Sequence, residues 1–464
     1  MRPRAIAPRA GLRVLIIDEN LQVPRDRRVW QECLALAKAG YRVSVICPRA
    51  ASDPPIEYLE GVALYRYPPA PATSGTMSFF YEFAYSWVRA LLLTLKVLRK
   101  EGFDVIQACN PPDTYFAIAW LYKRLGKRFV YDQHDLAPET YQARFEKPSR
   151  ALLWGLHLLE RLTYRTADRV IVTNNSYRDV ALGRGGKAPE HVVVVRNGPD
   201  PTQMQRGPAR PELRNGRRFL CCYLGIMGPQ DGVDLAVRAA DVLIHEMGRH
   251  DCSFALLGDG DSYQQIQALV HELGLQEYVT MPGFLGDGEL AAYLSTADLG
   301  LCPEPSNPLN QISTMVKTME YMAFELPVVA FDLNETRFSA ADAAAYVTPN
   351  EVKEFAAAIA ALLDDPDRRA DMGRAGRRRV EEALAWTHQA PTYVGVFDQL
   401  PRTGRVAESG NRLTASVERH RGPPTPTRFD NAEHALGSSP PRLGACQMRG
   451  MLRGCSERSR WPWS

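Results

Sequence analysis

The chain has 464 residues, of which 45% are hydrophobic and 23% charged; this is ordinary for a globular protein, and the length favours two or three domains. The formal net charge is +3, but residues 402–464 hold 11 arginines and 5 acidic residues, so all of the positive excess lies there. The rest of the chain is slightly acidic, which excludes the basic footprint of a nucleic-acid-binding protein.

Three further features bear on the compartment. Nine cysteines are scattered without a CxxC pair, which argues against a disulfide framework and indicates a reducing, cytoplasmic location. We expect no signal peptide, because a strand pattern begins at about residue 11. The most apolar window, residues 79–98, carries Glu82, Arg89 and Lys96 and is too polar for a membrane span. It predicts an amphipathic helix packed on a sheet, with a helix on a membrane surface as the alternative.

The first elements have the order strand, loop, helix, strand. Aliphatic residues at 13–17 predict a buried strand, and a helix over 29–39 and a strand over 41–47 follow. This order is typical of a doubly wound parallel sheet. The intervening loop lacks GxGxxG, which disfavours a dinucleotide site. It offers Arg25, Arg27 and Arg28 instead, and we take Arg25 and Arg28 as candidates for phosphate or acceptor contacts, although exposed loop arginines are common.

The best catalytic candidate of the first half follows a later strand. Strands are expected at 62–67, 104–109, 128–132, 169–173 and 192–196, with helices between them. The 128–132 strand runs into QHDLAPE, which places His134 and Asp135 just past a strand's carboxyl end, where such sheets bind ligands. The alternative for His134 is a structural or merely exposed loop histidine.

The alternation restarts after residues 198–216, a segment rich in Pro, Gly and Arg that predicts a linker. Strands are expected at 219–224, 254–257, 279–281, 299–302, 327–331 and 346–347, and helices then continue to about residue 400. Two such sheets joined by a linker predict a ligand cleft between two domains. From residue 401 no apolar period remains, so we predict a basic, disordered tail over 401–464.

An acidic pair follows the 254–257 strand. Asp259 and Asp261 stand one residue apart, and such carboxylates can hold a divalent cation. We favour a strand-to-helix turn, because no third acidic ligand stands nearby in the sequence and acidic residues suit a helix N-terminus.

The stretch from 297 to 337 is the most informative part of the second half. A helix is expected to begin near Ser313, whose hydroxyl can cap it, with its methionines facing the core. Its free N-terminus would attract phosphate at the strands' carboxyl edge. On the opposite face Lys317 can add a point charge, and Glu320 can accept hydrogen bonds from sugar hydroxyls. The alternative is an exposed Lys–Glu pair, worth about 0.2–0.5 kcal/mol.

Taken in order over residues 13–400, these motifs resemble family 4 glycosyltransferases. The motifs that carry the resemblance are DRRVWQECLALAKAGYRVSVICP, YDQHDLAPE, ADRVIVTN, GIMGPQDGVD, LLGDG, PGF, KTMEYMA and ELPVVAFDLNETR. The resemblance implies the GT-B fold, two Rossmann-like doubly wound domains facing across a cleft. It places an acceptor-side domain at 11–197, a nucleotide-sugar-binding domain at 217–388, and a helix at 389–400 that crosses back.

The same resemblance implies a retaining, hexosyl-type transfer from a nucleotide-diphosphate sugar to an acceptor hydroxyl, with no metal and no cofactor. Glu320 matches the second of two family acidic residues, usually a ribose ligand, whereas Ile312 occupies the place of the first. His134 matches a histidine near the reacting sugar, and Lys317 stands in for the bases missing after residue 228. The implied donor-binding residues are Gly228, Gly258, Gly283, Phe284, Asn310, Gln311, Ser313, Thr314, Lys317 and Glu320.

The expected partners are a nucleotide-sugar donor and a sugar or lipid-linked acceptor of surface polysaccharide or glycolipid synthesis. We expect a cytoplasmic protein with peripheral contact at the inner face of the membrane, and no nucleic acid. Three alternatives are weighed: a nucleotide-sugar epimerase of GT-B fold, a non-catalytic GT-B subunit, and a metal-dependent GT-A transferase. Ile312 and Gln230 favour the second, and Asp259 with Asp261 would serve the third.

Overall fold

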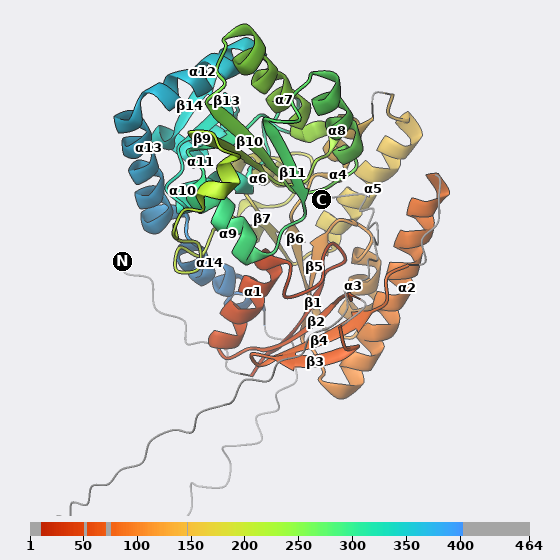
Figure 1. Ribbon diagram of the computed structural model, residues 1–464. Helices are drawn as coiled ribbons and strands as arrows, with labels where there is room; N and C mark the ends of the chain where they lie inside the picture. Colours follow the sequence, from red (N-terminus) through yellow and green to blue (C-terminus); the bar gives the residue numbers. More distant parts are fainter. Residues whose placement is uncertain (1–10, 51–52, 71–75, 146, 402–464) are drawn as a thin grey trace, which may run out of the picture. The chain divides into compact units, whose positions relative to one another are not determined.

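The computed structural model describes residues 11–50, 53–70, 76–145 and 147–401, so the predicted tail lies outside the described residues apart from residue 401. Strands and helices alternate along the chain in two successive sheets (Figure 1). The described residues of both sheets belong to one compact unit.

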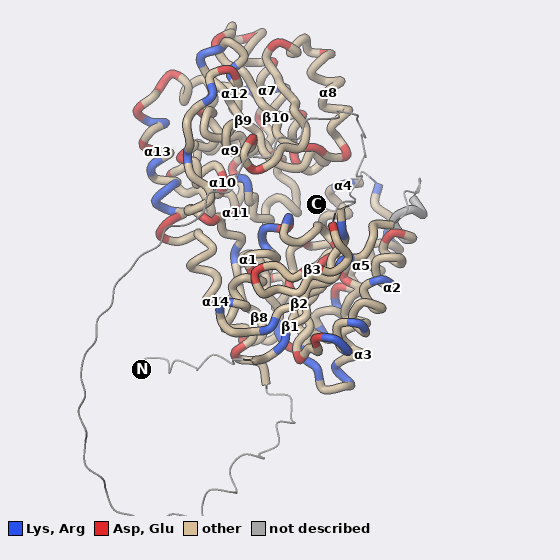
Figure 2. The backbone as a smooth tube through the Cα atoms, turned by 60° about the horizontal axis from the view of Figure 1, so that its bottom comes forward, with Lys and Arg blue, Asp and Glu red and all other residues tan. Residues whose placement is uncertain are grey.

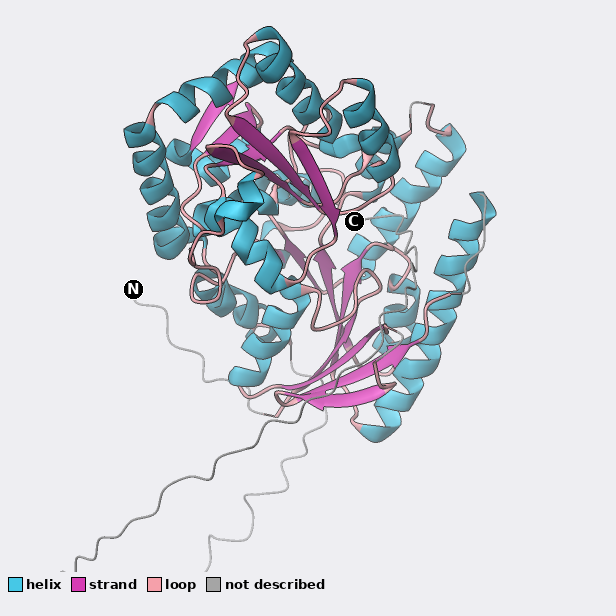
Figure 3. Cartoon of the chain, viewed as in Figure 1, coloured by secondary structure: helices cyan, strands magenta, loops and turns pink. Residues whose placement is uncertain are grey.

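The described residues of the N-terminal half form an eight-stranded sheet (Figure 3) in the order β3-β4-β2-β1-β5-β6-β7-β8. All of its pairs are parallel except β3 with β4 at one edge. The sequence pattern had not predicted β3. The strands are β1 (Arg13–Ile17), β2 (Arg42–Pro48), β3 (Ile56–Leu59), β4 (Val62–Tyr67), β5 (Val105–Asn110), β6 (Arg128–Gln133), β7 (Arg169–Val172) and β8 (Val192–Val194).

Helices cover both faces of this sheet. One core cluster joins it to α2, α3, α5 and α6, and a second cluster on the other face includes residues of α1 and α14. Among the described residues, no helix combines the length and apolarity needed to cross a membrane. The helices are α1 (Arg27–Lys38), α2 (Thr76–Lys100), α3 (Phe116–Lys123), α4 (Ala137–Arg144), α5 (Arg150–Thr166), α6 (Asn175–Leu182) and α14 (Trp386–Asp398).

Residues 217–401 contain a six-stranded parallel sheet in the order β11-β10-β9-β12-β13-β14, again with helices on both faces. The strands are β9 (Phe219–Leu224), β10 (Cys252–Leu257), β11 (Val279–Gly283), β12 (Leu299–Cys302), β13 (Val328–Phe331) and β14 (Ala344–Val347). The helices are α7 (Val233–Asp241), α8 (Tyr263–Glu272), α9 (Asp287–Thr296), α10 (Val316–Ala323), α11 (Asn334–Ala340), α12 (Val352–Asp364) and α13 (Pro366–Arg379).

Two helix starts differ from prediction. α1 begins at Arg27, because the Asp26 carboxylate accepts the Val29 amide at 2.9 Å and caps the first turn. Arg27 and Arg28 therefore lie in the helix rather than in the loop. α10 begins at Val316, so the prediction that Ser313 caps it is wrong. The Ser313 hydroxyl lies 3.1 Å from the Tyr177 hydroxyl of the N-terminal half, which holds it away from the helix.

Candidate functional site

Two loops at the carboxyl edge of the C-terminal sheet pack closely because both turn on glycine. Gly258, directly after β10, has φ +141°, and a Cβ there would lie 1.9 Å from the carbonyl oxygen of Gly225. Gly225 follows β9, and its amide donates to the Leu257 carbonyl at 3.0 Å. The loops after β9 and β10 therefore touch backbone to backbone.

The other predicted donor-binding glycines also shape these loops. The Gly228 amide donates to the Asp231 carboxylate at 2.9 Å, and the Gly258 amide donates to the Gly283 carbonyl at 3.1 Å. Both amides are thus engaged within the protein rather than directed at a ligand. Burial raises the pKa of Asp231 to about 6.

Lys317, the second residue of α10, aims its ammonium at the loop after β9. A Cβ on Gly225 would lie 3.1 Å from the Lys317 Nζ. This nitrogen donates to the Glu304 carboxylate at 2.6 Å and to the Tyr223 hydroxyl at 2.9 Å. Burial alone lowers the pKa of Lys317, but Glu304 and Tyr223 outweigh it and raise that pKa, so the amine is charged.

The Lys317–Glu304 pair has hydrogen-bonding capacity left. An ammonium has three N–H groups, and the two contacts above leave one for a ligand. Glu304 follows β12 and is 1% exposed, yet its second oxygen, Oε2, has no partner among the described residues. A buried acceptor without a partner is unusual in a folded protein. The pair therefore offers one donor and one acceptor next to the glycine loops.

The loop between β12 and α10 is held by its own side chains. The Asn310 amide donates to the carbonyls of Gln230 and Pro305 at 2.9 and 2.8 Å, and Gln311 donates to the Ser306 hydroxyl at 3.0 Å. Asn310 is buried, so of these two predicted sugar ligands Gln311 is the more accessible.

The end of the same loop contacts the N-terminal half. Asn174 caps α6 and also donates to the Ile312 carbonyl at 2.9 Å and the Thr314 hydroxyl at 3.0 Å. The Ile312 side chain packs against the N-terminal core. This contact gives a physical reason for an apolar residue where the resemblance leads one to expect a carboxylate.

Glu320 is engaged by an arginine from the first helix. Arg27 donates to the Glu320 carboxylate at 3.0 Å and also to Asp287 at the start of α9. Burial raises the pKa of Glu320, and the charge of Arg27 opposes that shift. Close by in the sequence, the Arg25 guanidinium lies 4.1 Å from the ring centroid of the exposed Phe284. Arg25 of the loop before α1 and Arg27, the first residue of α1, thus contact two predicted donor-binding residues.

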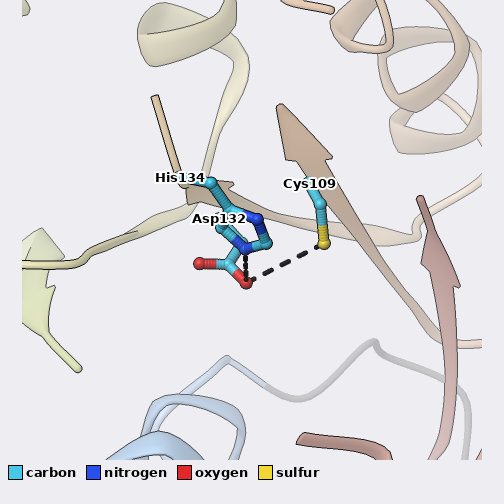
Figure 4. Close-up of side chains that lie close together, drawn as sticks. All are labelled: Cys109, Asp132 and His134. Atoms are coloured by element: carbon cyan, nitrogen blue, oxygen red, sulfur yellow. Dashed lines mark hydrogen bonds and ion pairs between the residues drawn. The ribbon is translucent and has the colours of Figure 1, made fainter. Parts of the chain in front are cut away.

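His134 belongs to a dense polar cluster under the N-terminal sheet's carboxyl edge. Its Nε2 lies 3.0 Å from Asp132 Oδ2, and Cys109 Sγ lies 3.9 Å from the same carboxylate oxygen (Figure 4). Arg28 Nε lies 3.1 Å from the same ring nitrogen. Both contacts fall on Nε2. A ring without a proton on Nε2 accepts from Arg28, whereas a ring with a proton on Nε2 donates to Asp132. The site of the proton on His134 therefore decides which neighbour the ring binds.

Arg28 is not placed to bind phosphate, contrary to the prediction. Besides His134 it donates to Asp132, to Asn197 and to the Val195 carbonyl at 2.7–3.1 Å, so four of its five N–H groups are used. Burial alone raises the pKa of Asp132, but Arg28 and His134 outweigh it and hold that pKa well below its usual value. Arg28 is therefore a buried counter-ion that orients His134.

Within the described residues, Cys109, Asp132 and His134 are the one group with metal-ligand spacing, their ligand atoms lying within 4.8 Å of one another. Arg28 already supplies a fixed positive charge to two of these three residues, and a second cation would be repelled. The two carboxylates of the GT-A alternative have separate partners. Arg144 binds Asp261, and Asp259 accepts a hydrogen bond from the Gly260 amide at 2.8 Å. Neither group fits a metal ion well.

The loop that carries His134 and Asp135 is held in place by the side chain of Asn110, the last residue of β5. The Asn110 side chain accepts the amides of both residues at 2.7 and 3.2 Å. Asn110 in turn donates to Asp113 at 3.1 Å, and Asp113 accepts the Tyr131 hydroxyl at 2.6 Å. Burial raises the pKa of Asp135 to about 6 and that of Asp113 to about 7.

Sequence reasoning missed several of these partners. Arg27 was noted only as a loop arginine, and Glu304, Tyr223 and Asp132 were not singled out at all. Glu304 and Asp132 had a usable signal, since each is an acidic residue at or just past the carboxyl end of an apolar strand.

Two family models match the chain in tandem. The first, described as a glycosyl transferase 4-like domain, matches residues 26–198, and the second, described as glycosyl transferases group 1, matches residues 218–365. The boundary between them falls in the segment predicted to be a linker.

Curated and solved relatives agree with these matches. D-inositol 3-phosphate glycosyltransferase from Kineococcus radiotolerans is 26% identical over 405 residues, covering 81% of this chain and 90% of that protein. Sucrose-phosphate synthase from Thermosynechococcus elongatus superposes with a TM-score of 0.71 at 20% identity, covering 84% of this chain and 98% of the other. For WaaG, a glycosyltransferase involved in lipopolysaccharide biosynthesis, the TM-score is 0.62 at 15% identity, with 83% and 99% covered. The predicted fold and family are confirmed, and the chain belongs to the family 4-type glycosyltransferases of the GT-B fold.

Proposed function

We propose that this glycosyltransferase moves a hexosyl group from a nucleotide-diphosphate sugar to an acceptor hydroxyl with retention of configuration and without a metal. The observation that carries the proposal is the buried Lys317–Glu304 pair beside the glycine loops after β9 and β10. It supplies a cationic donor at the carboxyl edge of the C-terminal sheet, where open parallel sheets bind nucleotides. A relative of the same fold, HepE of Anabaena, has been solved in complex with UDP and glucose.

The chemistry requires stabilisation of the departing phosphate. Negative charge develops on the leaving oxygen, and the spare N–H of Lys317 together with the N-terminus of α10 can meet it. The unpaired Oε2 of Glu304 can accept a hydrogen bond from a hydroxyl of the donor sugar. Ile312, which stands where the family has an acidic residue, cannot form such a bond. Glu320 remains the proposed ribose ligand, and it would exchange Arg27 for the ribose hydroxyls when donor binds.

Retention needs either a covalent nucleophile or attack guided by the leaving phosphate on the same face. The two carboxylates of the proposed donor site, Glu304 and Glu320, are each held in an ion pair. We therefore favour same-face attack. On the acceptor side, His134 and Asp135 follow β6 and are the groups proposed to contact the acceptor hydroxyl and the reacting sugar.

The acceptor is proposed to be a sugar on a lipid carrier at the cytoplasmic face of the membrane, in surface polysaccharide or glycolipid synthesis. The support is the amphipathic helix α2 and the likeness to WaaG. An epimerase or a non-catalytic subunit is not favoured, because relatives similar to this chain are named as glycosyltransferases.

The test is a transfer assay built in two steps. A thermal-shift screen with UDP-, GDP- and ADP-sugars identifies the donor, because a ligand that binds only the folded state raises Tm. The donor is then incubated with and without acceptor in the presence of EDTA, and NMR gives the anomeric configuration of the product. We expect product only with acceptor, unchanged by EDTA, with the donor's configuration. Conversion of donor alone would establish the epimerase, and loss of activity with EDTA would overturn the metal-free proposal.

A further inference from the structure

A pocket lies at the carboxyl edge of the N-terminal sheet, on the side of α2. Its volume is about 290 Å³, below the usual range for drug-sized ligands and suited to a small group. Cationic residues from three elements line it, one following β2, one on β4 and two on α2. These are Arg49, Arg66, Arg89 and Lys96.

The positive charge of this pocket is largely uncompensated. Arg66 is bound to Glu57 at 2.7 Å and lies 4.0 Å from Asp53, but its buried Nε makes no hydrogen bond within the described residues. The other three cations form no ion pair with any described residue; Arg89 only lies 5.5 Å from the ring of Tyr85. Several unpaired cations around one small pocket are an arrangement that attracts an anion.

The rest of the pocket is apolar. Leu92, Leu93, Pro55 and Pro68 complete its lining. Leu92 is 54% exposed, and Val88 and Leu95, one helical turn away on either side, are exposed as well. Figure 2 shows Lys and Arg recurring along α2. A ligand that fills the pocket therefore has a charged end and an apolar end.

The pocket is distinct from the site around His134. Arg49 follows β2, and His134 follows β6, three strands away in the same sheet. At about 4.8 Å between neighbouring strands, the two points are on the order of 15 Å apart. The donor diphosphate, which we place on the C-terminal sheet, does not occupy it.

We propose that this pocket binds the phosphate of a phosphate ester, and that the apolar lining makes a lipid phosphate its preferred form. Phosphate oxygens meet the guanidinium groups of Arg49 and Arg89 by charge-assisted hydrogen bonds, and Lys96 adds a point charge. Resting on the proposed function, the pocket anchors the phosphate of a lipid-linked acceptor while its sugar extends along the sheet edge toward His134.

The test compares two probes on the full chain. Glycerol 3-phosphate reports the phosphate contact by calorimetry, and flotation with phosphatidylglycerol–phosphatidylcholine vesicles, against pure phosphatidylcholine, reports the lipid. The variant Arg49→Ala/Arg89→Ala removes two cations that have no ion-pair partner, so folding should be unaffected. The matched control, Lys38→Ala/Arg238→Ala, removes the same charge from exposed helix positions outside the pocket and outside α2.

We expect the pocket variant to weaken binding of both probes at least about tenfold, and the control to change it less than about twofold. Leu92→Ser should weaken vesicle binding and leave glycerol 3-phosphate binding unchanged, which identifies a lipid phosphate as the ligand. If Leu92→Ser binds vesicles as tightly as the wild-type chain, the ligand is a soluble phosphate ester. Equal losses in pocket variant and control, or no binding of either probe, would overturn the proposal. Nucleotide-sugar binding, read by thermal shift, should not change in these variants. Its failure in the wild-type chain would remove the proposed function and leave the pocket standing.

Discussion

The two sheets each carry a buried ion pair at their carboxyl edge, but the two pairs differ in how completely they are satisfied. Around Arg28 and Asp132 most polar groups have a partner, and Gln107 links Asp132 to Tyr393 of α14 through bonds of 2.9 and 2.7 Å. The buried Glu32 belongs to the same cluster, and its Oε1 forms no hydrogen bond but lies 3.1 Å from Arg28 Nε in an ion pair. Around Lys317 and Glu304 one donor and one acceptor remain. A more fully paired network holds a shape, whereas a partly paired one has room for a ligand.

This contrast assigns different work to the two halves. The N-terminal cluster positions His134 before any ligand arrives, since its neighbours are already bonded to one another. The C-terminal cluster keeps unused hydrogen-bonding capacity, which in the proposed function the phosphate and hydroxyl groups of the donor would fill. Each prediction below tests one side of that contrast.

The largest effect is expected from Arg28→Ala. It leaves the buried carboxylate of Asp132 without its cation, and breaking a buried pair in this way lowers the free energy of unfolding by about 3–5 kcal/mol. Denaturant unfolding measures it. The control is Arg27→Ala, one residue earlier and partly exposed, which should cost about 1 kcal/mol or less. Similar losses in both variants would show that the cluster does not hold the N-terminal half together.

Lys317→Ala should act mainly on catalysis. Removing one donor from the departing phosphate is expected to lower kcat by about 10²–10³. The change also leaves the buried Glu304 carboxylate without its cation, which lowers stability, so the effects on stability and on activity must be measured separately. The double variant Lys317→Met/Glu304→Gln removes both charges and should recover stability without recovering kcat. Lys353→Ala, on the exposed side of α12, is the matched control. Recovery of activity in the double variant would refute the catalytic role.

Asp113 gives the N-terminal cluster a pH dependence. Burial raises its pKa to about 7, above the value of about 3.9 in an unfolded chain, so between these values the folded protein binds more protons than the unfolded one. Stability therefore falls as pH rises from about 4 to about 7, by at most about 1.4 kcal/mol per pH unit from this group. In Asp113→Asn that contribution should vanish, which unfolding curves at several pH values would show. An unchanged slope would mean that other groups carry it.

The fold was predictable because local patterns determine it. Apolar runs bounded by turns gave most of the strands, and their alternation with amphipathic helices implied parallel sheets. The edge strand β3 was not predicted, because it is short and only partly buried. The start of α10 also escaped, because Ser313 is held by Tyr177, a residue far away in the sequence.

The site was less predictable for the same reason. His134 and Lys317 could be selected from their places after a strand and in a helix. Their partners could not, because Arg28 approaches His134 across 106 positions and Arg27 approaches Glu320 across 293. Nothing in a local pattern distinguishes Arg28, a buried counter-ion, from its exposed neighbour. The two arginines differ because Asp26 caps α1 and thereby fixes which residues of the helix face the core.

The smallest effects concern the Arg27–Glu320 contact, where the two halves meet at the proposed ribose site. Arg27 is partly exposed, so we expect Glu320→Gln to change stability by about 1 kcal/mol or less. If Glu320 exchanges Arg27 for the ribose, Glu320→Gln should raise the donor KM about tenfold, whereas Arg27→Ala should leave it unchanged or lower it, because the competing partner is gone. A double-mutant cycle on KM separates competition from joint binding. Equal rises in KM for both single variants would show that Arg27 binds the donor alongside Glu320, and would place the arginine in the site rather than in front of it.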